Sequence, residues 1–237
     1  QTDVIDLVQF HDLRQPNEPA RILHGGALEA AIAAREEGKL RFIGFTGHYS
    51  PDLHAEMLAH PHPWDAVQMP INVRDAEDRS FACQILPILR ARGIGAIGMK
   101  SLAGGRLLRA GFEPEEALGY ALSQPIDVLV TGIDSLEILS QNLRIARAFH
   151  YVEEGEQEAL IGRAEEADRR NPHPTHHRVA CCLTRRVDHL HRRRFRARCD
   201  QEGVHLLRED LGGGLRYLQH PVPVISRHRH RRDPAVT

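Results

Sequence analysis

Short apolar, β-branched segments alternate with longer helix-forming segments along the first 170 residues, and this alternation leaves few possible folds. The sequence predicts strands at 4–10, 42–46, 66–69, 94–99 and 128–131. It predicts helices at 27–37, 51–60, 80–92, 114–123, 136–148 and 153–169. Strands of four to seven residues between helices of ten or more are typical of parallel βα units whose helices cover the sheet.

The boundaries of several predicted helices carry their own signals. Gly38 follows the first helix, and Ser50 with Pro51 opens the second as N-cap and first helical residue. Pro87 falls inside the helix predicted at 80–92, where we expect it to bend the helix.

The spacing of about 25 to 40 residues per unit fits a closed barrel of eight βα units or an open doubly wound sheet. Periodicity alone does not separate these two folds. No G-x-G-x-x-G motif follows any predicted strand, so the dinucleotide fingerprint of the open-sheet class is absent.

Charge divides the chain into two parts, which we predict as domains 1–170 and 171–237. From Asn171 onward there are 14 Arg and no Lys against 6 acidic residues, a net charge of +8. Because the whole chain carries −1, residues 1–170 carry −9. The second part also holds 9 of the 16 His and three of the four Cys. Such a contrast suggests segments of different origin or fate.

The Arg- and His-rich part, 171–237, is predicted to be irregular or disordered, and two readings of it stay open. Clustered Arg could form a basic arm that binds nucleic acid, since guanidinium groups neutralise phosphates. Out-of-frame translation of a GC-rich gene would also yield Arg, His, Pro and Cys in excess, and we favour this reading over nucleic-acid binding.

Other features bear on the class of protein. No run of apolar residues reaches the roughly 18 to 20 needed to span a membrane, and no secretion signal precedes the first strand, so a cytoplasmic protein is expected. The Cys residues form no C-x-x-C pair, and no metal site is predicted, although His173, His176 and His177 could bind a metal adventitiously. The chain begins at Gln1 inside a strand pattern, so we expect upstream sequence.

Five segments in order resemble strands four to eight of the aldo-keto reductases, a family of nicotinamide-dependent oxidoreductases. They are Asp3–His11 (DVIDLVQFH), Gly38–Gly47 (GKLRFIGFTG), Val67–Asn72 (VQMPIN), Gly98–Gly105 (GMKSLAGG) and Thr131–Ser135 (TGIDS), the last followed by Gln141 and Asn142. The resemblance implies a partial (β/α)8 TIM barrel over about 1–170, with the N-terminal strands of the family absent.

The resemblance implies that His11 is the active-site His that directs the substrate carbonyl and donates to the developing oxyanion. A His at the C-terminal end of a barrel strand faces the mouth, where it can stabilise negative charge on oxygen. A loop His that merely caps the strand is the alternative.

The same resemblance assigns Thr46 and Gln68 to the nicotinamide carboxamide. Relatives often have Asn after the position of Thr46, where this chain has Gly47, and His48 could compensate. Gln68 could instead pair with a neighbouring strand. Met99 stands where many relatives place an aromatic ring against the nicotinamide, and a thioether can pack there more weakly.

Further along the cofactor, Lys100 would lie near the pyrophosphate, unless it is simply a solvated Lys at a strand end. Gly132 and Ser135 would form the phosphate loop at a helix N-terminus. Gln141 and Asn142 would contact the adenine. The implied cofactor is NADP, and NAD stays possible because Ile138 replaces an Arg that relatives often use for the 2′-phosphate and Asp134 adds negative charge.

The family's general acid is a Tyr supported by a Lys and an Asp, all from the first three strands, and none of the four Tyr here matches that motif. General acid catalysis typically contributes roughly 10²- to 10⁴-fold, so residues 1–237 alone are expected to be inactive or nearly so. The expected activity of the whole is reduction of small-molecule aldehydes or ketones. The alternative is a non-catalytic nicotinamide-binding relative that acts as a sensor or subunit.

Overall fold

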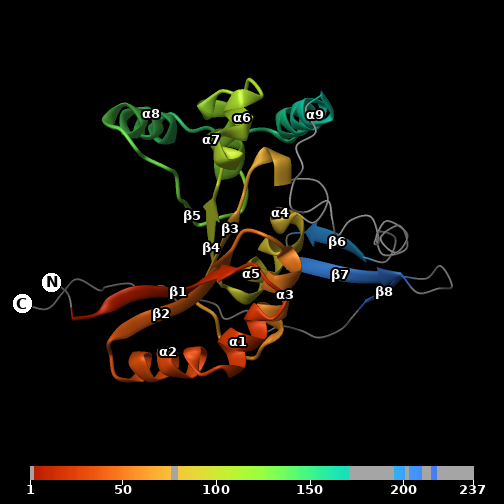
Figure 1. Cartoon of the computed structure of the whole chain (residues 1–237). Coiled ribbons are helices and arrows are strands. Elements are labelled where there is room, and N and C mark those ends of the chain that lie inside the picture. Colours follow the sequence, from red (N-terminus) through yellow and green to blue (C-terminus); the bar gives the residue numbers. More distant parts are fainter. Residues whose placement is uncertain (1–2, 76–79, 171–194, 201–202, 210–214, 218–237) are drawn as a thin grey trace, which may run out of the picture. The chain divides into compact units, whose positions relative to one another are not determined.

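The computed structural model (Figure 1) describes residues 3–75, 80–170, 195–200, 203–209 and 215–217. The chain divides into two compact units, Gln1–His177 and Arg178–Thr237. All the candidate site residues lie in the first unit.

The first unit is organised by one five-stranded parallel sheet in the order β1-β2-β3-β4-β5. The strands are β1 (Ile5–Leu13), β2 (Leu40–Gly47), β3 (Ala66–Pro70), β4 (Gly95–Met99) and β5 (Val128–Leu129). Each new strand is added beside the previous one, whereas a doubly wound sheet reverses its direction of addition at a switch point. The predicted α/β fold, a partial TIM barrel with parallel strands, is therefore confirmed.

The helices follow the predicted pattern with three differences. They are α1 (Glu18–His24), α2 (Ala27–Glu36), α3 (Pro51–Ala59), α4 (Phe81–Gln84), α5 (Leu86–Arg92), α6 (Arg106–Arg109), α7 (Pro114–Leu122), α8 (Leu136–Arg147) and α9 (Glu154–Arg170), with 3₁₀ turns η1 (Val73–Asp75) and η2 (Ala103–Gly105). The helix predicted at 80–92 is divided at Ile85, just before Pro87. Neither α1 nor α6 was predicted. Among the strands, β5 is shorter than the expected 128–131.

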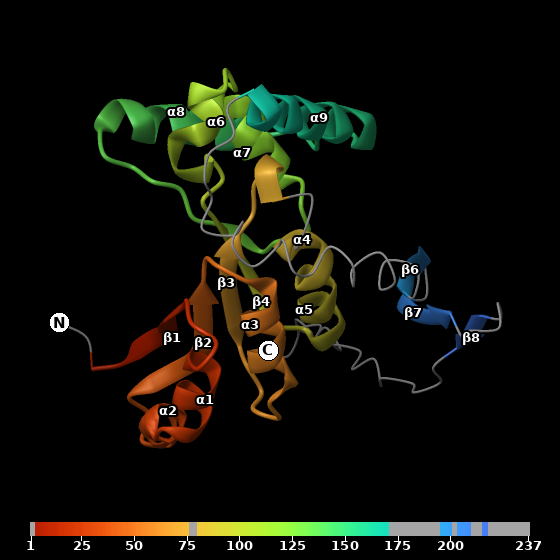
Figure 2. The same ribbon diagram turned by 45° about the vertical axis from the view of Figure 1, so that its right-hand side comes forward.

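One large apolar core joins the sheet to its helices. Figures 1 and 2 show α2 lying along β2 and α5 beside β4. The core includes Phe45 of β2 and Trp64, whose rings meet edge to face with centroids 5.0 Å apart. Val67 and Met69 of β3 are fully buried in it. Packing in this core therefore fixes the positions of the residues at the C-terminal ends of these strands.

A second, smaller core joins η1, α6, α7 and α9. Its buried members are Val73, Leu107, Phe112, Ala117, Tyr120, Leu160 and Ala164. The capping box of Glu113 and Glu116 fixes the start of α7. These elements thus form one packed body although they lie apart along the sequence.

Large apolar side chains are exposed at the outer part of the sheet. Ile5 of β1 and Phe42 of β2 are 54% and 47% exposed, and Val128 and Val130 at β5 are 54% and 46% exposed. An open sheet also leaves unpaired backbone groups on its two outermost strands. Both edges therefore have the character of surfaces that favour further pairing.

The second unit contains a three-stranded antiparallel sheet, β6 (Phe195–Asp200), β7 (Gly203–Glu209) and β8 (Leu215–Tyr217). The sequence led us to expect an irregular or disordered tail over 171–237, and within it the structure describes these three strands. His173, His176 and His177 lie outside the described residues, so their prediction stays untested. Within the described part of the chain, no helix has the length and apolar character required to cross a membrane.

Candidate active site

A cavity of about 390 Å³ opens at the C-terminal ends of the strands. It is lined by His11, Thr46, His48, Gln68, Met99, Lys100, Val130, Thr131 and Gly132. The strand register brings these ends together, since Thr46 pairs with Gln68 and Pro70 with Met99. In parallel barrels this end of the sheet carries the functional groups.

Six of the nine predicted site residues share this cavity, namely His11, Thr46, Gln68, Met99, Lys100 and Gly132. They come from five separate segments of the chain. Ser135, Gln141 and Asn142 do not line it. The cavity therefore gathers the four residues expected at the nicotinamide end together with Lys100 and Gly132, which were expected near the phosphates. Outside it lie Ser135 of the expected phosphate loop and the two residues expected at the adenine.

His11 lies at an irregularity in β1. The pairing with β2 shifts between Phe10 and Leu13, so His11 and Asp12 interrupt the regular ladder. The side chain of His11 is 66% exposed, with its ring 6.3 Å from that of His48. A ring on the cavity wall with this exposure can meet a small molecule without displacing core residues.

Asp12 is a feature of the site that the sequence analysis missed. Its side chain is only 4% exposed, and it accepts hydrogen bonds from Arg14 Nε and from His48 Nδ1, the latter at 3.0 Å. Burial disfavours its charge, but the hydrogen bonds from Arg14 and His48 outweigh burial and hold the pKa of Asp12 below its usual value. His11 Nε2 lies 3.9 Å from the same carboxylate. An ionised Asp12 therefore lies next to both His side chains of the cavity, hydrogen-bonded to His48 and 3.9 Å from Nε2 of His11.

Gly47 occupies a place where the structure has no room for a side chain. A Cβ added there would lie 2.8 Å from Cε1 of His54 and 2.9 Å from Cβ of Leu13. His54 is fully buried, and burial lowers its pKa to about 4. The absence of a side chain at Gly47 therefore leaves room for the buried, neutral imidazole of His54. His48, which we considered as a replacement for the missing Asn, lines the cavity with Nδ1 already bound to Asp12.

Thr46 presents a buried hydroxyl with no hydrogen-bond partner among the described residues. The residue is 5% exposed and lines the cavity. A buried polar group without a partner costs roughly 1 to 3 kcal/mol, so a polar ligand atom at this position would be stabilising. This orphaned hydroxyl fits the expected carboxamide contact.

The amide of Gln68 is held between its neighbours. Its Oε1 accepts from Gln9 Nε2 at 3.1 Å, and its Nε2 lies 3.3 Å from Sδ of Met99. This is the pairing with neighbouring strands that we weighed as the alternative. Sulfur is a weak acceptor, so the Nε2 donor can be exchanged for a better partner at small cost.

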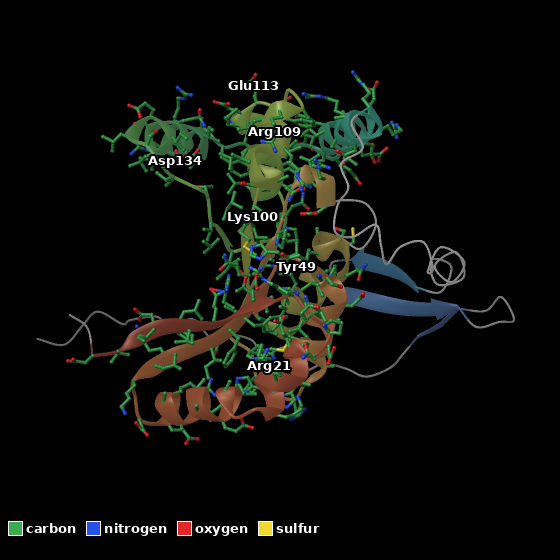
Figure 3. All side chains as sticks on the ribbon, viewed as in Figure 1. Arg21, Tyr49, Lys100, Arg109, Glu113 and Asp134 are labelled. Atoms are coloured by element: carbon green, nitrogen blue, oxygen red, sulfur yellow. The ribbon has the colours of Figure 1, made fainter. Side chains whose placement is uncertain are left out.

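Lys100 begins a tight turn after β4 (Figure 3). Its φ is 57°, in the left-handed region, and its carbonyl accepts from the amide of Ala103 at 2.7 Å. Non-glycine residues seldom adopt this conformation, and they do so mainly where the surrounding structure fixes it. The side chain is exposed at the cavity rim, where its cation is available to an anionic group.

The segment after β5 is ordered by its own side chains. Ser135 caps α8 by accepting from the amide of Ile138 at 3.2 Å. Asn142 donates from Nδ2 to Thr131 Oγ1 at 3.2 Å and to the carbonyl of Gly132 at 3.5 Å. Asn142 therefore braces the loop in this structure, and Gln141 is half-buried on the same helix.

A run of consecutive parallel βα units with a polar cavity at the strand ends defines a barrel-type cofactor or substrate site. The aldo/keto reductase family model matches residues 1–120, half of the chain. The chain belongs to the aldo/keto reductase family.

Solved structures agree on the fold. Aldo-keto reductase AKR11C1 from Bacillus halodurans, in its holo form, matches with a TM-score of 0.54 at 19% identity, over 68% of this chain and 59% of that one. MGS-M4, an aldo-keto reductase enzyme from a Medee basin deep-sea metagenome library, matches with a TM-score of 0.52 at 15% identity, over 68% and 60%. The chain spans about 60% of the length of these relatives. No curated protein sequence matches.

Proposed function

We propose that this chain supplies the cofactor-binding part of a nicotinamide-dependent oxidoreductase that reduces aldehydes or ketones. One observation carries the proposal: six expected site residues, from five separate segments of the chain, line a single cavity of about 390 Å³. Its volume lies within the range of roughly 300 to 1,000 Å³ typical of small-molecule sites. A cytoplasmic location is part of the same proposal.

The residues of the cavity fit a nicotinamide group. The orphaned hydroxyl of Thr46 and the amide of Gln68 would hold the carboxamide, and Met99 would pack against the ring. Lys100 would face the pyrophosphate. When bound, a reduced nicotinamide supplies the hydride for carbonyl reduction.

His11 would bind the carbonyl oxygen of the substrate and donate a hydrogen bond to it as negative charge develops. The low pKa of Asp12 keeps a carboxylate behind His48 and within 3.9 Å of His11 Nε2. Turnover additionally needs a proton donor, which in the family is a Tyr, so we propose that residues 1–237 alone bind cofactor with little or no turnover.

NADP is the proposed cofactor on family grounds, with NAD as the competitor. The exposed carboxylate of Asp134 near the start of α8 opposes a 2′-phosphate, whereas the capped N-terminus of that helix favours an anion. Titration of both cofactors decides between them.

Isothermal titration of the full chain with NADPH and NADH tests the proposal. We expect saturable binding that Thr46→Val weakens by about 5- to 15-fold, since a neutral hydrogen bond is worth roughly 1 to 1.5 kcal/mol. Thr46→Ser, which keeps the hydroxyl, is the matched control and should bind like the parent chain. Absence of saturable binding, or equal affinity of the Val and Ser variants, would contradict the proposal.

Turnover is measured separately with an aromatic aldehyde and NADPH, following absorbance at the nicotinamide band. The measurement is made on residues 1–237 and on the same chain joined to the first three strands of a relative. Turnover in the joined chain supports the reductase. Cofactor binding without turnover in the joined chain would favour the non-catalytic sensor or subunit.

A further inference from the structure

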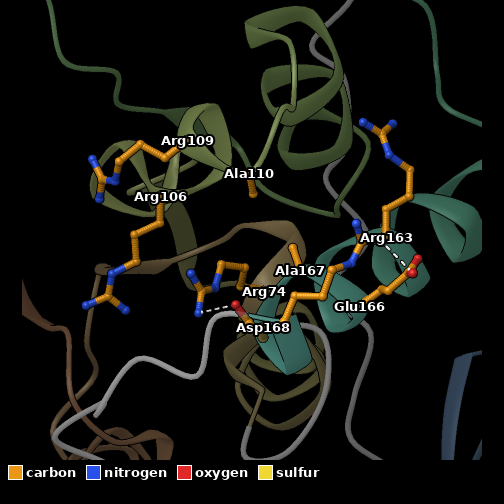
Figure 4. Close-up of a pocket in the computed structure, with 9 residues that line it drawn as sticks. Arg74, Arg106, Arg109, Ala110, Arg163, Glu166, Ala167 and Asp168 are labelled. Carbon is orange, nitrogen blue, oxygen red and sulfur yellow. Dashed lines mark ion pairs between the residues drawn. The ribbon is translucent and has the colours of Figure 1, made fainter.

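A second cavity, also of about 390 Å³, lies over the small core and shares no lining residue with the first. Figure 4 shows α6 contributing to it on one side and α9 on the other, with Arg74 of η1 between them. It is lined by Arg74, Arg106, Arg109, Ala110, Arg163, Glu166, Ala167, Asp168 and Arg170. Five of these nine residues are Arg.

The walls of this cavity are held in place by packing rather than by the charged side chains. Val73 beside Arg74, Leu107 beside Arg106 and Leu160 of α9 belong to the same buried core. Arg74 and Arg106 therefore project from backbone that the small core holds in place. A site whose charges are positioned in advance loses less entropy on binding.

The acidic side chains of the cavity balance only part of its positive charge. Arg74 pairs with Asp168 at 2.7 Å, and Arg170 pairs with Glu166 at 2.7 Å. Arg163 is engaged outside the lining, with Glu116 and with the ring of Phe112, 4.4 Å from its guanidinium carbon.

Arg106 and Arg109 make no ion pair with any described residue, yet both line the cavity. They follow each other by three positions on α6, which places them on neighbouring positions of one helical face. Counting the lining side chains alone, five guanidinium groups face two carboxylates. Like charges gathered in a recess repel one another and focus a positive potential there. Binding of an anion would reduce this repulsion between the guanidinium groups.

We propose that this cavity binds a small phosphorylated molecule. Guanidinium groups bind phosphate in a bidentate manner, and several of them around one recess suit a group with two or more negative charges. Arg106 and Arg109 would make the main contacts, while Arg74 stays partnered by Asp168 and completes the wall. The site does not depend on the nicotinamide cavity, so it adds a second ligand to the proposed function.

Isothermal titration of the full chain with inorganic pyrophosphate tests this site, with citrate in a parallel arm. We expect saturable pyrophosphate binding that the double variant Arg106→Gln, Arg109→Gln weakens at least tenfold. The matched control is Arg21→Gln, Arg147→Gln, which removes two exposed Arg from α1 and α8 with the same change in net charge. This control should bind pyrophosphate within about twofold of the parent chain, since screening makes distant surface charges weak.

A second variant guards against an indirect effect of the first. Ala110→Glu places a carboxylate in the lining and should also weaken pyrophosphate at least tenfold, while NADPH binding by both variants stays unchanged. Equal losses in the pocket and control doubles, absence of saturable binding, or citrate binding as tightly as pyrophosphate would overturn the proposal. Loss of NADPH binding in the Thr46→Val variant would leave this result untouched, so the two proposals fail separately.

Discussion

The two ends of the proposed cofactor site are built in different ways. At the nicotinamide end, Thr46 and Met99 are 5% and 6% exposed and stand on a core in which Phe45 is fully buried. At the other end, Ile133 and Leu136 are 53% and 76% exposed, and the loop is ordered by the cap of Ser135 and the amide of Asn142. Packing of many side chains fixes the first end, and a few local hydrogen bonds fix the second. We therefore expect mutations to have large effects on stability at the first end and small ones at the second.

The largest contrast is between two apolar truncations. Phe45→Ala removes a fully buried ring that contacts Trp64 and His54, and it should cost about 3 to 5 kcal/mol of unfolding free energy. Leu136→Ala, at an exposed position on α8, should stay within about 0.5 kcal/mol of the parent chain. Urea denaturation followed by circular dichroism measures both. Similar losses for the two variants would remove the distinction between the ends.

The unfolding free energy should depend on pH because of His54, which is buried at the nicotinamide end. Its pKa is about 4 when folded against an ordinary value of 6.5, chiefly because burial disfavours the charged ring. As pH falls below 6.5 the unfolded chain takes up the proton first, so stability is lost down to about pH 4 and levels off below it. The unfolding free energy lost through protonation of His54 should be on the order of 3 kcal/mol.

The control for this effect is His54→Phe, which keeps a ring of similar size and cannot titrate. The difference in unfolding free energy between the two chains, measured from pH 7.5 to 4.5, isolates the histidine. A difference that is independent of pH would show that His54 is not buried in its neutral form.

Much of this architecture follows from the sequence, because strand and helix signals are local. Ser50 caps α3 through the amide of Asp52, as its position before Pro51 predicts. In contrast, α1 was not predicted, although a proline such as Pro19 is tolerated in the first turn of a helix. Burial of Asp12 was also missed, because it depends on the shift of register between β1 and β2.

The expected site residues divide along the same line. The family resemblance pointed to His11, Thr46 and Gln68 near strand ends, and in a parallel sheet such ends meet at one edge, where all three line the cavity. The bond from Asn142 to Thr131 joins a helix to the loop before it, and side-chain rotamers across a loop leave no periodic signal. Nor does the sequence pattern reveal the Arg-lined cavity, whose members are spread over three elements.

Substitution of two glycines compares the packing at the two ends, with a smaller expected effect on stability. Gly47→Ala places a Cβ 2.8 Å from His54 and 2.9 Å from Leu13, and such crowding of a packed core typically costs about 1 to 3 kcal/mol. Gly132→Ala is the matched substitution at the other end, where an added Cβ meets no atom within 4 Å. Thermal unfolding should show a clear loss for the first and almost none for the second. A larger loss of stability for Gly132→Ala than for Gly47→Ala would contradict tighter packing at the nicotinamide end.

The smallest expected effect concerns the loop itself. Asn142→Ala removes the bonds to Thr131 and Gly132 and should lower the unfolding free energy by about 1 kcal/mol. Asn142→Asp keeps an acceptor but loses the donor, so it should behave like the Ala variant rather than the parent. Full stability of Asn142→Asp in urea denaturation would show that the donor is not what braces the loop.

Hydrogen exchange of the full chain with and without NADPH tests the central claim most directly. We expect slower exchange in residues 44–48, 67–70 and 97–101, which end three neighbouring strands, with a smaller change at 131–135. Exchange in α1 and α2 should not change. Protection confined to the Arg-lined segments 106–110 and 163–170, or absent from all three strand ends, would contradict the assignment of the nicotinamide cavity.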